Sequence, residues 1–348
     1  MKTTCLLFFS IIFNTLSFAQ TPKSLVTEGI KLHDNGKYEL AIQKYDAAIE
    51  LDKNYFDAYY EKSYSLYASN KLDDCIVLSE KIIEQFPTNP SLNAVYVQIG
   101  NAQDDQGNHK AALKTYQKGL KKFPNYFLLQ YNKGITHLAL DELDDAYEDF
   151  QNALIDNPLH ASSYFRITEL RKNDNHIAAM LAAIMFLTLE PQTERSKTTF
   201  ATLQQLMYGN VKRTGDNAVT IYINSSLLSK KKGKNKLDDF SSQELLFAMS
   251  SAIEKDTAVG NIAKTVVDKF DLKLQLLISG LDERGKGFFK DRYVPFFKQL
   301  KENNYTNVLS HIVYTIANDE RNAGWLKVNT SKVAAFYQWL KSYNWPQK

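Results

Sequence analysis

Histidine, cysteine, serine and carboxylate side chains could carry out catalysis or hold a metal ion, and their spacing in this chain predicts neither. The six histidines include no pair at the i, i+4 spacing that places two ligands on one helix face. The acidic run from Asp141 to Asp149 lacks the alternate-residue pattern of a calcium loop. Gly285-Lys286-Gly287 lacks the spacing of a phosphate-binding loop. We therefore expect no catalytic residues, no metal, no cofactor and no enzymatic activity.

The charge of the chain does not predict a nucleic-acid partner. Lys and Arg number 42 against 39 Asp and Glu, a net charge of +3, which is too small to attract polyanions strongly. Residues 230–236 contain five lysines, but no aromatic residues lie between them, as single-strand binding would need. We expect a solvated loop there. Contact with a phosphate or an acidic partner surface is the alternative.

The first nineteen residues have the pattern of a secretory signal peptide. Lys2 precedes an apolar run from Leu6 to Leu16, and Ser17-Phe18-Ala19 provides the small residues of a cleavage site before Gln20. The run is shorter than the roughly 20 residues of a spanning helix, so an uncleaved anchor is the less favoured alternative. We expect an exported chain, periplasmic or secreted, with no membrane span after cleavage. Its remaining cysteine, Cys75, should be buried.

A period of 34 residues organises the first half of the chain. Gly100 and Gly134 are one period apart, and Gly29 precedes Gly100 by two periods plus three residues. Such a period predicts a solenoid in which each repeat is one supersecondary unit. The recurring small and large positions are Gly29, Ala41, Tyr45, Ala48; Ser63, Cys75, Ile82; Gly100, Ala112, Tyr116, Gly119; and Gly134, Ala146, Phe150, Ala153.

This pattern resembles tetratricopeptide repeats (TPR), each a pair of antiparallel helices. The resemblance places repeats at about 22–55, 56–89, 93–126 and 127–160, with a degenerate fifth at about 161–192. In this register Cys75 occupies the small position that is alanine in the other repeats. The whole chain resembles secreted bacterial TPR proteins that have a helical C-terminal extension and no assigned activity.

The second half is helical by pattern but is not repeated. Helices are expected at 195–208, from 241 toward 254, and at 262–281, 289–303, 308–317 and 333–343. Ala218–Ile223 alternates β-branched residues and could form one strand, for which we find no partner in the sequence. We therefore predict an all-α chain: a signal peptide at 1–19, a TPR helix-turn-helix solenoid at 20–192 and a helical C-terminal domain at 193–348 that caps or docks on it.

A partner-binding groove is the functional site that the resemblance implies, lined by the first helix of each repeat. Tyr60, Tyr64 and Tyr67 share one helix stripe by spacing alone. Some TPR co-chaperones hold carboxylates with Lys and Asn, but Val26 and Ile30 occupy two of those places here, so that clamp is not expected. The predicted groove residues are Tyr60, Tyr64, Tyr67, Val97, Asn101, Asp104, Tyr131, Ile135, Phe165 and Glu169.

These features favour a non-enzymatic scaffold of the bacterial cell envelope that binds a protein or peptide partner through the concave TPR groove. Three alternatives stay open at this point. The C-terminal domain could fill the groove as core, an enzymatic site could lie in residues 193–348, or the chain could be a self-assembling subunit of an envelope complex.

Overall fold

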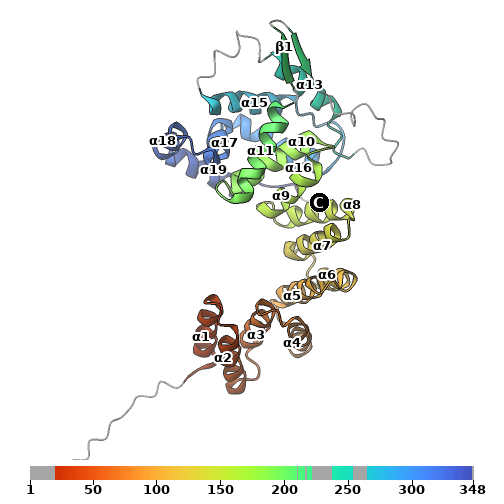
Figure 1. Ribbon diagram of the computed structural model, residues 1–348, viewed down its shortest axis with the longest axis vertical. Helices are drawn as coiled ribbons and strands as arrows, with labels where there is room; N and C mark the ends of the chain where they lie inside the picture. The colour runs from red at the N-terminus through yellow and green to blue at the C-terminus, as the bar shows by residue number, and fades with distance from the viewer. Residues whose placement is uncertain (1–19, 210, 216–217, 222–236, 254–264, 347–348) are drawn as a thin grey trace, which may run out of the picture. The chain divides into compact units, whose positions relative to one another are not determined.

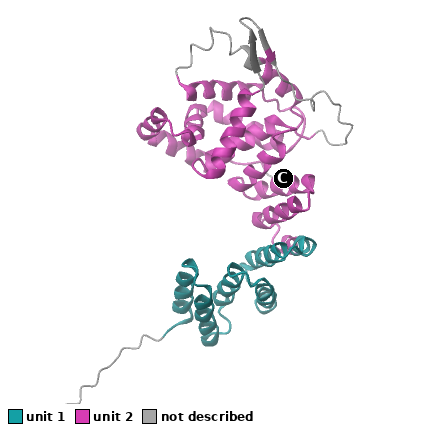
Figure 2. Ribbon diagram, in the orientation of Figure 1, with its two compact units in different colours: residues 1–115 teal, residues 116–348 magenta. Residues whose placement is uncertain are grey.

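A computed structural model describes residues 20–209, 211–215, 218–221, 237–253 and 265–346. The chain divides into two compact units, residues 1–115 and 116–348, coloured separately in Figure 2. The predicted signal peptide and the lysine-rich residues 230–236 lie outside the described residues. The predicted boundary between residues 192 and 193 stays a prediction.

Unit 1 consists of successive helices that pack against their neighbours in chain order (Figure 1). The first helices of the pairs also contact one another, α1 with α3 and α3 with α5, so they form one layer. The helices are α1 (Pro22–Asp34), α2 (Tyr38–Leu51), α3 (Phe56–Ala68), α4 (Leu72–Gln85), α5 (Leu92–Asp105) and the start of α6 (His109–Lys122).

Local sequence signals explain these helices. Thr21 and Ser24 form a reciprocal capping box at the start of α1, with backbone-to-hydroxyl distances of 3.1 and 2.9 Å. A Cβ atom on Gly29 would lie 2.3 Å from Cε1 of Tyr45, so only glycine allows α1 and α2 to cross this closely. Cys75 is completely buried beside Leu66, as its small repeat position predicted.

Unit 2 is organised around one buried helix. Every residue of α10 (His176–Leu189) from Ile177 to Thr188 is buried, because helices pack against it on several sides. The other helices in the first part of the unit are α7 (Phe127–Ala139), α8 (Leu143–Asp156), α9 (Ala161–Arg171) and α11 (Glu194–Tyr208).

The remaining elements of unit 2 confirm the predicted helical class. They are α13 (Ser241–Ile253), α15 (Val266–Gly280), α16 (Phe288–Glu302), α17 (Thr306–Val313), a 3-10 turn (Tyr314–Ala317), α18 (Glu320–Val328) and α19 (Thr330–Ser342). The Tyr164 hydroxyl on α9 lies 2.8 Å from that of Tyr293 on α16. The Tyr337 hydroxyl on α19 donates to the Thr188 carbonyl at 2.8 Å. The helices after residue 192 therefore share one core with α9 and α10.

One small hairpin accompanies the helices. β2 (Ala218–Ile221) pairs antiparallel with β1 (Val211–Gly215), and the register shifts between Arg213 and Gly215. The expected strand therefore has a partner, which the sequence pattern did not reveal because Val211–Gly215 is short and polar. None of the helices in the described part of the chain is both long and apolar enough to cross a membrane.

Candidate functional site

Three tyrosines form a stripe along α3 in unit 1. Tyr60, Tyr64 and Tyr67 are four and three residues apart, so the helix repeat places them on one face. Tyr64 keeps 46% of its surface exposed, and Tyr60 and Tyr67 are half-buried. The Tyr60 ring stacks on Phe56, with centroids 6.0 Å apart. A half-exposed aromatic stripe is suited to a partner, because the rings provide apolar contact while the hydroxyls remain hydrated.

Contacts with the neighbouring first helices place this stripe between α1 and α5. The His33 ring of α1 stacks on Tyr64 at 5.0 Å, and its Nδ1 lies 2.7 Å from the Ser65 hydroxyl. The Tyr67 hydroxyl donates to Oδ2 of Asp105 on α5 at 2.5 Å. Burial and this hydrogen bond raise the pKa of Tyr67. We call Tyr60, Tyr64 and Tyr67, together with His33 and Asp105, the tyrosine face.

The other predicted groove residues of unit 1 lie on α5. Val97, Asn101 and Asp104 are half-buried and follow one another at spacings of four and three residues. Oδ1 of Asp104 lies 2.6 Å from Nδ1 of His109. Asp105 was not among the predicted residues, although it stands four residues after Asn101 and so lies close to the same face.

The predicted groove residues of unit 2 are half-buried against its core. Tyr131 and Ile135 on α7 pack against buried residues, and the Tyr131 ring meets His160 edge-on at 4.7 Å. Oε2 of Glu169 accepts a hydrogen bond from Nζ of Lys172 at 2.7 Å. The Phe165 ring on α9 packs against that of Phe186, with the ring centroids 5.5 Å apart.

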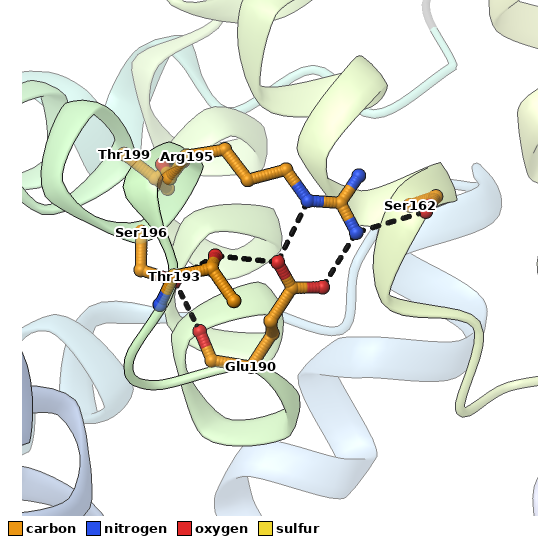
Figure 3. Close-up of polar contacts among 6 residues, drawn as sticks. All are labelled: Ser162, Glu190, Thr193, Arg195, Ser196 and Thr199. Atoms are coloured by element: carbon orange, nitrogen blue, oxygen red, sulfur yellow. Dashed lines mark hydrogen bonds and ion pairs between the residues drawn. The ribbon is translucent and has the colours of Figure 1, made fainter. Parts of the chain in front are cut away.

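An arginine of α11 covers Phe165. The Arg195 guanidinium lies 5.5 Å from the Phe165 ring centroid and donates to Ser162 at 3.1 Å. Figure 3 shows that the Glu190 carboxylate holds this guanidinium, with Nε of Arg195 at 2.7 Å, and also accepts from the Thr193 hydroxyl at 2.6 Å. Arg195 of α11 therefore lies against Phe165, one of the predicted groove residues.

A shallow hollow of about 340 Å³ opens on another side of α3, between α2 and α4. Lysines stand around an apolar floor, and two of them are already paired: Lys62 with Asp46 at 2.6 Å and Lys71 with Glu39 at 3.4 Å. The lining residues are Ile42, Lys62, Leu66, Lys71, Asp74, Val77, Leu78 and Lys81.

Two buried carboxylates of unit 2 accept hydrogen bonds from backbone N–H groups at helix starts. Asp238 accepts from the Lys290 backbone N–H at 2.9 Å near the start of α16, and Glu244 accepts from that of His176 at 2.7 Å at the start of α10. Burial raises the pKa of Asp238 to about 6 and that of Glu244 to about 7. Among the described residues, no group of three His, Cys, Asp or Glu side chains could hold a metal ion.

Comparison with known families identifies tetratricopeptide repeats in two segments of the chain. Residues 29–70 match the family described as TPR repeat, and residues 97–167 match the one described as tetratricopeptide repeat. Tetratricopeptide repeat protein 33 of Homo sapiens is 30% identical over 106 residues, which are 30% of this chain and 39% of that protein. The chain therefore spans about two fifths of the length of this relative.

Similar solved structures cover about half of the chain. PilF of Pseudomonas aeruginosa has a TM-score of 0.46 at 18% identity, covering 53% of this chain and 83% of that one. TTC0263 of Thermus thermophilus has a TM-score of 0.43 at 15% identity, and the match covers 52% of this chain and 98% of that one. YrrB is described as a TPR protein with an unusual peptide-binding site. It has a TM-score of 0.37 at 18% identity, and the match covers 49% of this chain and 88% of that one. From the family matches and the helix pairs together, residues 29–70 and 97–167 of this chain are tetratricopeptide repeats.

Proposed function

We propose that this chain is a non-enzymatic scaffold of the bacterial cell envelope that binds a protein or peptide partner through the tyrosine face. Its repeats are of a kind typical of protein–protein interaction. The observation that carries the proposal is the half-open aromatic stripe of α3, with Tyr64 46% exposed between α1 and α5. The location in the envelope rests on the signal-peptide pattern of residues 1–19.

Unit 1 is the better place for a partner than unit 2. In unit 2, Phe165 is already covered by Arg195, and Tyr131 and Ile135 pack against the unit's own core. That arrangement favours intramolecular filling for this part of the predicted groove. The tyrosine face of unit 1 keeps aromatic surface open, and aromatic anchors usually provide much of the energy of an interface.

The test compares two double variants of the chain from Gln20 onward. Tyr60→Ala with Tyr64→Ala removes two rings of the tyrosine face. Leu40→Ala with Val77→Ala removes two exposed apolar side chains on α2 and α4. Each protein is used to capture partners from envelope extracts, and its thermal unfolding is measured in parallel.

We expect the tyrosine variant to lose captured proteins that the control retains, at nearly unchanged melting temperature. Half-exposed rings should cost clearly less stability than the ~3–5 kcal/mol of a core aromatic. Unchanged capture by the tyrosine variant would contradict the proposed surface. A melting temperature lowered by many degrees would instead show that the rings are core.

A further inference from the structure

The tyrosine face is bordered by carboxylates from all three of its helices. Asp57 and Glu61 lie beside the stripe on one side of α3, Asp34 ends α1 next to His33, and Asp104 and Asp105 lie at the end of α5. Tyr67 bonds to Asp105 at 2.5 Å, so this carboxylate is part of the face. Carboxylates from α1, α3 and α5 therefore lie near the tyrosine stripe.

Several of these carboxylates lie close to one another. Glu61 is half-buried, and its pKa is raised by burial first and then by the negative charges of Asp57 and Asp34. Like charges held together without a cation destabilise one another. An incoming positive charge would relieve that repulsion, so a cation is favoured here over a neutral group.

The lysines of unit 1 that form ion pairs do so elsewhere. They pair with Glu28, Asp46 and Glu39. Among the described residues, Asp34, Asp57 and Glu61 have no Lys or Arg within ion-pair distance, and Asp104 is paired with His109 alone. The negative charge of Asp34, Asp57 and Glu61 is therefore left for a partner to match.

The tyrosine rings are a second reason to expect a positively charged partner. A Lys or Arg side chain placed over an exposed tyrosine ring gains a cation–π interaction of about 0.5–1 kcal/mol. Tyr64, the most exposed ring of the stripe, stacks on His33 beside the acidic end of α1, and Tyr67 bonds to Asp105 at the end of α5. An extended segment lying along the stripe could place its cations over the rings and near the carboxylates at once.

We propose that the tyrosine face docks a basic peptide segment of a partner protein, in which Lys or Arg residues alternate with apolar ones. This inference rests on the proposed function and adds the charge of the partner. The proposed partner segment is positively charged, whereas a groove that holds carboxylates with Lys and Asn takes a negatively charged one. The absence of such a clamp at Val26 and Ile30 agrees with it.

The test is a selection of random twelve-residue peptides displayed against the immobilised chain from Gln20 onward. Two charge variants accompany the parent. Asp34→Asn with Asp57→Asn and Glu61→Gln removes three of the carboxylates that border the tyrosine face. Asp74→Asn with Glu80→Gln and Glu84→Gln removes the same charge from exposed positions of α4.

We expect the selected peptides to be enriched in Lys and Arg over Asp and Glu. For a synthesised binder, affinity measured by fluorescence anisotropy should fall about tenfold in the face variant and less than about twofold in the α4 variant. Binding to the parent should also weaken as salt rises from 50 to 300 mM, on the order of severalfold.

The outcomes separate the two proposals. One outcome is that the selected peptides need Tyr60 and Tyr64 but show no charge preference, or prefer acidic residues. This outcome overturns the proposal of a basic peptide and leaves the proposed function standing. No tyrosine-dependent peptide, together with capture insensitive to Tyr60 and Tyr64, overturns both. A third outcome is that peptides are selected only after the five lysines of residues 230–236 are replaced by serine. This outcome would show that the chain's own segment occupies the tyrosine face, which contradicts the proposal of a separate partner.

Discussion

The thiol of Cys75 is completely buried, and burial raises its pKa to about 11. Because the thiolate is the reactive form, we expect alkylation in the folded chain from Gln20 onward to be far slower than in denaturant. Mass spectrometry after timed labelling measures both rates. Equal rates would mean that Cys75 is not at the helix crossing. Cys75→Phe should lower the free energy of unfolding by ~1–3 kcal/mol through overpacking.

Protonated Glu244 should contribute stability to unit 2 in mild acid that is lost toward neutral pH. Burial first, and then the nearby charges of Asp174 and Asp239, raise its pKa from 4.5 to about 7. The folded state therefore holds this proton more tightly than the unfolded state does. The contribution of Glu244 to the free energy of unfolding consequently falls as pH rises from about 4.5 to about 7, by up to about 1.4 kcal/mol per pH unit.

Glu244→Gln should remove this contribution, because the amide oxygen can still accept from the His176 backbone N–H but the side chain carries no titrating proton. Denaturant unfolding at several pH values, compared with the parent, measures the change in slope. Glu84→Gln, on the exposed side of α4, is the matched control and should leave the slope as it is. The same slope in Glu244→Gln as in the parent would contradict this role.

At the scale of elements, glycines set how closely paired helices approach. A Cβ atom on Gly134 of α7 would lie 2.8 Å from Cε1 of Phe150 on α8. We therefore expect Gly134→Ala to lower the free energy of unfolding by about 1–3 kcal/mol. Gly324→Ala in α18, where nothing lies within 4 Å, should instead gain up to about 1 kcal/mol of helix propensity. Chemical denaturation of both variants checks the contrast. A gain in both would mean that α7 and α8 do not cross this closely.

The repeat helices could be predicted from sequence because their signals are local and periodic. Gly29 and Tyr45 recur as Gly134 and Phe150. In both pairs the aromatic ring lies where a Cβ atom on the glycine would be. The β1–β2 pairing was missed, since Val211–Gly215 shows no alternating apolar pattern. A short polar strand is recognised only from its partner.

The predicted site was recoverable to a different extent in each unit. The stripe Tyr60, Tyr64 and Tyr67 follows from helical spacing, which needs no knowledge of the rest of the chain. Arg195 over Phe165 could not be predicted, because it depends on how α11 packs. The carboxylates Asp238 and Glu244 were also missed, since the backbone groups that they accept from lie 52 and 68 residues away along the chain.

At the scale of the whole molecule, export is a prediction from residues 1–19. We expect the chain isolated from its native host to begin at Gln20, because Ser17-Phe18-Ala19 follows a short apolar run. Intact mass spectrometry of the purified protein measures the N-terminus. A retained Met1, or recovery wholly in the membrane fraction, would contradict export by a cleaved signal peptide.

Partner binding at the tyrosine face is the central claim, and site-specific photo-crosslinking in the native host tests it most directly. A benzoylphenylalanine replaces Tyr64 in one strain and Val77, an exposed side chain on α4, in another. We predict that the probe at Tyr64 gives a discrete crosslink to another protein, lost when Tyr60→Ala is added, and that the probe at Val77 does not. Crosslinks from Tyr64 only to residues 193–348 of the same chain, or equal crosslinking from both positions, would contradict the account.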